Sequence, residues 1–287
     1  MMGDEVLLIS LRLIVNSSDA DIVIQSVDGL LFQIHRKNLE TNTGAFPGPE
    51  FDSQGEIVFL SEPAEVLGVV FQFIYPRKHP TLKDLDFKLV AEVAEAVEKY
   101  EVFSAMRVCE LRLRDFLPQQ AVDIFVYAVK HDYFELIDET ASLIARSPSL
   151  PVLRKLPSHC FIPWIEYQAA WDQIFDNAFQ HIDGYGHHTI CVTIKTFSGT
   201  GPPTIGDSIC INCRSGMISW ITELKRIGSL DYLKHAIENP NISLWDLDHR
   251  WCENCKGSEC RSFREVLRIC EDGVENIASF TDFLKLD

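Results

Sequence analysis

Two pairs of closely spaced cysteines in the last third of the chain are the residues best suited to chemistry. Cys210 and Cys213 lie in "SICINCRSG", and Cys252 and Cys255 lie in "RWCENCKGSEC", with Cys260 close behind. Two thiolates three residues apart can bind one tetrahedral zinc ion at about 2.3 Å, and a second pair completes a closed four-sulfur site. The spacing therefore predicts structural zinc bound by Cys210, Cys213, Cys252 and Cys255, and no other cofactor.

Other interpretations of these cysteines compete with structural zinc. A redox dithiol needs one exposed pair at a helix N-terminus with a lowered thiol pKa, and the acidic character of the chain opposes that shift. Catalytic zinc of the deaminase type needs a His-x-Glu motif, which "WCENC" lacks. Ordinary buried thiols stay open as a further interpretation. We expect His181, His187 and His188, which have no carboxylate partner in register, to be surface residues of a glycine-rich stretch.

The charge of the chain argues against nucleic-acid binding. Lysine and arginine number 26 and aspartate and glutamate number 42, which gives a formal net charge of −16. A surface this acidic repels phosphate backbones. With 46% apolar and 24% charged residues among 287, the chain is long and apolar enough for two globular domains.

An apolar run near the N-terminus, "EVLLISLRLIV", lacks the features of a secretory signal or a membrane anchor. Asp4 precedes the run, Glu5 is its first residue, and Arg12 interrupts it. The run has about half the length of a membrane span. We expect an N-terminal extension over residues 1–17 and no membrane association. Nine cysteines without a secretory signal predict reduced thiols, and therefore a protein of the cytoplasm, the nucleus or both.

Strand and helix patterns begin directly after this extension. Two short β-branched and apolar runs, 22–25 and 30–34, flank Asp28-Gly29, a dipeptide typical of tight hairpin turns. The stretch "GEIVFL" predicts a third strand, and a helix follows from Ser61 until Pro76, with Val66, Val69 and Val70 on its apolar face. The apolar pattern recurs over 86–106 and includes Phe103, whereas the Gly- and Pro-rich "TNTGAFPGPEF" predicts a loop. Strands followed by amphipathic helices predict an α+β domain.

Three segments of this domain carry a family resemblance. "DADIVIQSVDGLLFQIHRKNLE", "EIVFLSEPAEVLGVVFQFIYP" and "DFKLVAEVAEAVEKYEVFSAMRVCE" resemble successive blocks of a BTB/POZ domain, in the form common in mushroom-forming fungi. The resemblance covers residues 18–117 and implies a small sheet wrapped by helices. It also implies a protein-interaction module, since many BTB domains form homodimers and some are substrate adaptors for cullin-type ubiquitin ligases. In this family pattern His35 matches a structural histidine that closes the hairpin and caps the next helix.

The remainder of the chain is predicted to be mostly α-helical. Residues 118–150 predict a helical extension of two amphipathic helices, and a proline-rich stretch after it predicts a boundary near residue 150. In the C-terminal domain, 151–287, a stripe at helical spacing is typical of a core and includes Trp164, Trp171, Ile174, Phe175 and Ala178. A strand over 189–194, one helix over 217–237 and one last helix from residue 262 complete the prediction. The apolar face of the last helix includes Phe263, Val266 and Cys270. "FSGTGPP" lacks the Gly-Lys-Ser/Thr of a phosphate loop.

The sequence as a whole predicts an interaction protein without enzymatic activity. Its expected partners are proteins, with a second copy of the chain and a cullin scaffold among those that the BTB/POZ resemblance implies, and neither nucleic acid nor membrane. Two alternatives stay open: a transcription-linked scaffold without direct DNA contact, and a thiol or zinc enzyme.

Overall fold

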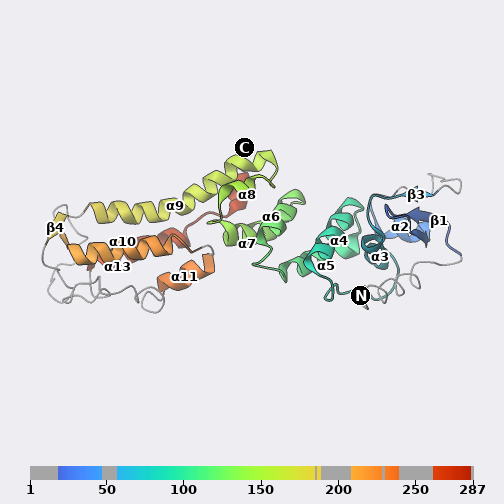
Figure 1. The fold of residues 1–287 in the computed structure, drawn as a ribbon, viewed down its shortest axis with the longest axis horizontal. Coiled ribbons are helices and arrows are strands. Elements are labelled where there is room, and N and C mark those ends of the chain that lie inside the picture. The colour runs from blue at the N-terminus through green and yellow to red at the C-terminus, as the bar shows by residue number, and fades with distance from the viewer. Residues whose placement is uncertain are drawn as a thin grey trace. The chain divides into compact units, whose positions relative to one another are not determined.

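The structure of the chain is a computed structural model that describes residues 19–46, 57–184, 186–188, 208–227, 230–238 and 261–285, with the backbone alone at 186–188, 208–212, 230, 231 and 261. The chain is α+β and divides into two compact units, the first ending at Gln120 and the second beginning at Ala121 (Figure 1). The predicted extension over 1–17, the strand over 189–194 and most of the loop after residue 46 lie outside the described residues. Within the described ranges, no helix is both long and apolar enough to cross a membrane.

A three-stranded sheet opens the first unit, with strand order β2-β1-β3. β1 (Ile22–Gln25) and β2 (Leu31–Ile34) pair antiparallel, which confirms the predicted hairpin, and Gly29 takes the φ of +85° that its turn requires. β3 (Val58–Phe59) lies along the other edge of β1 and runs parallel to it. Because side chains alternate between the faces of a strand, one face of the hairpin is directed to the core, and its buried residues are Ile22, Ile24, Phe32 and Ile34.

Helices α2 (Arg36–Asn42), α3 (Ala64–Val70), α4 (Phe87–Lys99) and α5 (Phe103–Arg114) follow, and the 3-10 turn η1 (Phe71–Phe73) continues α3. α3 begins at Ala64 and not at Ser61, because Pro63 is its extended N-cap. The Asp28 carboxylate in the hairpin turn accepts the Ala64 N–H at 2.9 Å, so the hairpin fixes the start of this helix. The apolar pattern over 86–106 belongs to two helices, which separate where Glu101 has a φ of +50°. Phe103, expected on the core face, is 58% exposed at the start of α5.

The second unit begins with the two helices predicted as an extension, α6 (Ala121–Lys130) and α7 (Phe134–Ile144). They are followed by α8 (Ser149–Leu153), the 3-10 turn η2 (Ser158–Cys160) and the long helix α9 (Phe161–Asp183). α7 packs against α14 (Phe280–Leu284) at the other end of the unit. The predicted boundary near residue 150 stays a prediction.

The rest of the second unit contains one parallel strand pair and three more helices beside α14. β4 (Gly186–His188) pairs with β5 (Ser208–Cys210), and α10 (Ile211–Leu224), α11 (Leu230–Glu238) and α13 (Arg261–Glu275) follow. α10 and α13 pack along α9 (Figure 1). The predictions of one helix over 217–237 and one last helix are wrong: α10 and α11 are separate, and α13 ends before α14 begins.

The break between α13 and α14 has a physical cause in the aromatic core. Phe280 inserts among Phe125, Trp164 and Tyr167, with ring centroids 5.3, 5.6 and 5.5 Å away. The Asp138 carboxylate accepts the Thr281 N–H and hydroxyl at 2.9 and 2.8 Å, which satisfies the new helix start. The predicted aromatic stripe of α9 is confirmed as core, since its predicted residues are all buried: Trp164, Trp171, Ile174, Phe175 and Ala178.

Candidate functional site

The structure describes only half of the predicted zinc-binding set. Cys210 is the last residue of β5, and Cys213 lies buried in the first turn of α10. Cys252 and Cys255, like Cys260, lie outside the described residues. Among the side chains that the structure describes, no group of three or more His, Cys, Asp or Glu residues is arranged to hold a metal. The four-cysteine site therefore stays a prediction.

Three other cysteines are buried in the cores of the two units. Burial raises the pKa of the Cys109 thiol to about 12, of Cys160 to about 11 and of Cys270 to about 12. At neutral pH all three are protonated, and a protonated thiol is a poor nucleophile and a poor metal ligand. These three side chains pack the interior, which is the ordinary role of a buried cysteine.

His35 occupies the N-cap of α2, but its side chain makes no capping hydrogen bond. The Asp21 carboxylate accepts the Arg36 N–H there, at 2.7 Å. The imidazole of His35 instead lies between Tyr75 and Asp19, with Nδ1 3.3 Å from the Tyr75 hydroxyl and Nε2 3.3 Å from an Asp19 carboxylate oxygen. Burial raises the pKa of Tyr75, so its hydroxyl is not activated as a base. The contact joins the end of β2 to the segment after η1, which is a structural role.

A second polar cluster, which the sequence did not indicate, ties α3 to the end of α4. Lys99 Nζ donates to Glu62 Oε1 at 2.6 Å and to the Ser61 hydroxyl at 2.7 Å, and the Tyr100 hydroxyl donates to the other Glu62 oxygen. Burial alone would raise the pKa of Glu62, but the hydrogen bonds from Lys99, Tyr100 and Ser61 lower it below its ordinary value. Burial and Glu62 raise the pKa of Tyr100 to about 12. The ionised Glu62 carboxylate and the protonated Tyr100 hydroxyl hold two secondary-structure elements together. Because Tyr100 stays protonated near neutral pH, it does not act as a general base there.

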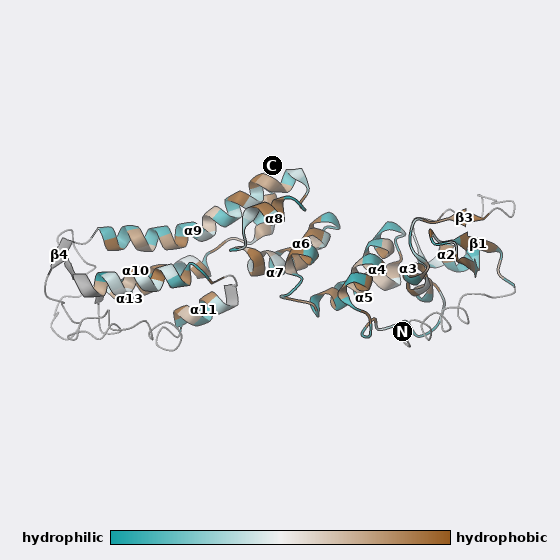
Figure 2. Cartoon of the chain, viewed as in Figure 1, coloured by the Kyte–Doolittle hydropathy of each residue, from teal (hydrophilic) through white to brown (hydrophobic). Residues whose placement is uncertain are grey.

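The face of the sheet opposite the core carries exposed apolar side chains. Leu31 on β2, Gln25 on β1 and Phe59 on β3 are register partners and form one row across the three strands. Leu31 is 46% exposed and Phe59 is 73% exposed. Ile57, two residues before Phe59, and Val27 in the hairpin turn are exposed as well, and Figure 2 shows the apolar colouring of the strands β1 and β3. We call Val27, Leu31, Ile57 and Phe59 the sheet-face patch; exposed apolar groups gathered in this way are typical of contact surfaces.

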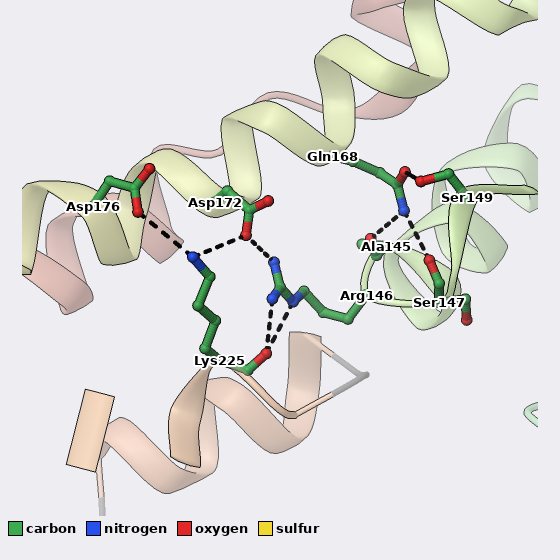
Figure 3. Close-up of polar contacts among 8 residues, drawn as sticks. All are labelled: Ala145, Arg146, Ser147, Ser149, Gln168, Asp172, Asp176 and Lys225. Atoms are coloured by element: carbon green, nitrogen blue, oxygen red, sulfur yellow. Dashed lines mark hydrogen bonds and ion pairs between the residues drawn. The ribbon is translucent and has the colours of Figure 1, made fainter. Parts of the chain in front are cut away.

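In the second unit, a polar cluster joins α9 to the chain after α7 and to the end of α10 (Figure 3). Arg146 donates to Asp172 on α9 at 2.5 Å and to the Lys225 carbonyl at 2.8 and 3.2 Å. Lys225 Nζ lies 3.5 Å from both Asp172 and Asp176. Burial acts to raise the pKa of Asp172, but Arg146 and then Lys225 bring it below its ordinary value. Every charge in the cluster has a partner of opposite sign, and the cluster clamps three elements together.

The histidines predicted to lie in a surface loop are in a strand. His187 and His188 belong to β4, where His187 is the register partner of Ile209 and His188 that of Cys210. Sequence reasoning missed this strand because three residues without β-branched side chains give no periodic signal. His181 is in the last turn of α9, where burial lowers its pKa. The strand pair places a histidine beside one of the predicted zinc ligands.

Comparison with protein-family models finds no family that matches this chain, and comparison with curated proteins finds no matching relative. The BTB/POZ resemblance therefore depends on the residues quoted above.

Proposed function

We propose that the first unit is a BTB/POZ-like protein-interaction module and that the chain acts as an adaptor or scaffold. The observation that carries this proposal is the sheet-face patch. The core face of the same sheet is filled by Ile24, Phe32 and their neighbours, whereas Leu31 and Phe59 are exposed on the opposite face. Large apolar side chains that are exposed to water on a strand surface are unfavourable. Contact with a protein partner would remove them from water and so contribute favourable binding free energy.

The polar groups of the first unit support a binding role in preference to catalysis. Both clusters described above, around His35 and around Glu62, connect secondary-structure elements and contain a tyrosine whose pKa is raised. Neither cluster places a nucleophile beside an activated base. We propose on this basis that the chain contributes contact surface and has no catalytic activity of its own.

The partner class follows from the BTB/POZ resemblance. The first proposal is a substrate adaptor that presents client proteins to a cullin-type ubiquitin ligase. The second is a transcription-linked scaffold, for which the net charge of −16 argues against direct DNA contact. A cullin scaffold should co-purify with the full chain at micromolar concentration if the first proposal holds, and its failure to do so would remove the ligase role.

Paired substitutions test whether the sheet-face patch is the contact surface. Leu31→Ser together with Phe59→Ser should reduce recovery of protein partners, or of a second copy of the chain, by at least about tenfold, because loss of two apolar anchors costs a few kcal/mol of binding free energy. Phe103→Ser is the matched control, since Phe103 is an exposed phenylalanine on α5 of the same unit. Light scattering measures self-association and affinity capture with mass spectrometry measures other partners. Equal partner recovery by the double variant and the unsubstituted chain would contradict the proposal.

A further inference from the structure

The sheet-face patch gathers most of the exposed apolar side chains of the first unit. In the part of that unit that the structure describes, six large apolar side chains are exposed, and four of them form the patch. Phe59, at 73%, and Val27, at 66%, are the most exposed of the six. The other two, Phe103 and Leu111, are on α5. Such a concentration of apolar side chains on one surface indicates that another segment or molecule covers it.

Residues 5–15, which we call the N-terminal run, have the composition of a covering segment. Eight of these eleven residues are apolar, and the polar Ser10 and Arg12 are both even-numbered. At helical spacing these two would lie about 200° apart and interrupt opposite sides of the run. In an extended chain successive side chains lie on opposite faces, so Ser10 and Arg12 would share one face. The other face would then be entirely apolar, with Leu7, Ile9, Leu11, Leu13 and Val15.

The N-terminal run is connected to the sheet by a short stretch of chain. Asp19 is fixed beside the end of β2, since its carboxylate lies 3.3 Å from Nε2 of His35, the residue after that strand. Val15, the last residue of the run, precedes Asp19 by four residues and is therefore at most about 14 Å from it. Leu31 of the patch is about 13 Å along β2 from His35. The run is thus tethered within reach of the patch.

We propose that the N-terminal run packs on the sheet-face patch of its own chain through its apolar, odd-numbered residues. Contact removes apolar side chains of both surfaces from water, and an apolar run left in water would be prone to aggregation. A tether of a few residues gives an effective concentration on the order of millimolar, which favours the run of the same chain over that of a second copy. The run and a protein partner then compete for one surface, a consequence that rests on the proposed function.

Photocrosslinking of the full chain tests the contact. Benzoylphenylalanine in place of Phe59 should crosslink to the N-terminal run, whereas the same group in place of Phe103, the exposed phenylalanine of α5, should not. A mixture of isotopically light and heavy chains identifies the origin of the run, because a crosslink within one chain never joins light to heavy peptides. Crosslinks that join light to heavy chains would overturn the inference in favour of a second copy. No crosslink from position 59 to the run, or equal yields from the two positions, would overturn it outright.

Paired substitutions in the full chain test which face of the run makes the contact. Ile9→Asp with Leu11→Asp should remove most of the crosslink from position 59, because a carboxylate is costly to bury among apolar side chains. Leu8→Asp with Ile14→Asp adds the same charge to the even-numbered face and is the matched control, which should keep the crosslink. Equal crosslink yields for the two double variants would refute the assignment of the odd-numbered face.

Partner recovery separates this inference from the proposed docking role. If both hold, Ile9→Asp with Leu11→Asp uncovers the patch and raises the recovery of protein partners, whereas Leu31→Ser with Phe59→Ser lowers it. Unchanged recovery for the Ile9 and Leu11 variant would contradict the competition between run and partner. Failure of every chain to recover a partner would count against the docking role alone, since the crosslinks are measured without a partner.

Discussion

Truncation of Phe280 to alanine should destabilise the second unit more than other single phenylalanine changes in it. Phe280 is completely buried, and its ring makes edge-to-face contacts with Phe125, Trp164 and Tyr167. It is also the first residue of α14, the C-terminal helix that packs against α7 and α9. The substitution therefore leaves a cavity at the point where the end of the chain meets the helices at the start of the unit.

The expected loss is about 4 kcal/mol of unfolding free energy, because burial of a phenylalanine and the cavity left by its removal together cost about 3–5 kcal/mol. The three aromatic contacts, at about 0.5–1.5 kcal/mol each beyond area burial, place Phe280 above the lower end of that range. The hydrogen bonds from Thr281 to Asp138 remain and should keep α14 attached. For a unit of this size, such a loss lowers the melting temperature by about 8–16 °C.

Tryptophan fluorescence in urea measures this loss in the second unit alone, because all five tryptophans follow Gln120 in the sequence. Phe134→Ala is the control: Phe134 starts α7 in the same unit and is 58% exposed, so its truncation should cost at most about 0.5 kcal/mol. A loss below about 1 kcal/mol for Phe280→Ala, or equal losses for the two variants, would refute the account of the aromatic core given above.

Three further substitutions test other contacts. A Cβ on Gly273 would lie 2.8 Å from Cγ2 of Ile174, so Gly273→Ala should cost about 1–2 kcal/mol in spite of its higher helix propensity, and Gly273→Ala with Ile174→Ala should cost less than the sum of the two single losses in urea unfolding. Glu62 has a lowered pKa in the folded chain, so its stabilising contribution is present above its ordinary pKa and is lost as pH falls through the folded value; the hydrogen-exchange protection factors of α3 and α4, corrected for the intrinsic rate at each pH, should therefore fall more on acidification in the unsubstituted chain than in Glu62→Gln. Arg146→Met removes three charge-assisted hydrogen bonds and should cost about 1.5–3 kcal/mol by tryptophan fluorescence, whereas the exposed Arg154→Met should change little.

Local sequence signals predicted the hairpin and the buried face of α3 in the first unit. Asp28-Gly29 between two β-branched runs identified the hairpin, because a turn of this kind depends on a few neighbouring residues. The apolar periodicity of α3 identified Val66, Val69 and Val70 as core residues, and all three are buried. The Glu62 cluster was missed, because Lys99 and Tyr100 reach it from a distant part of the chain.

Helix ends in the second unit were predicted less well than helix faces. Phe263, Val266 and Cys270 were expected on the core face of the last helix and are buried on α13. The end of that helix was not expected, since Phe280 leaves the helical path to pack against aromatic rings of α6 and α9. The β4–β5 pairing was missed for a related reason: three-residue strands are stabilised by each other and carry no pattern of their own.

The sequence by itself determined which residues are apolar, where they recur at helical or strand spacing, and therefore which face of elements such as α3 and α9 is buried. It also determined that the chain is acidic and that its cysteines occur in pairs. Only the tertiary structure decided where helices stop, which strand edge takes a parallel partner, and that His188 lies beside Cys210. The physical reason is that burial patterns arise from neighbouring residues along one element, whereas helix ends, strand partners and ligand sets depend on contacts between residues that are far apart in the chain.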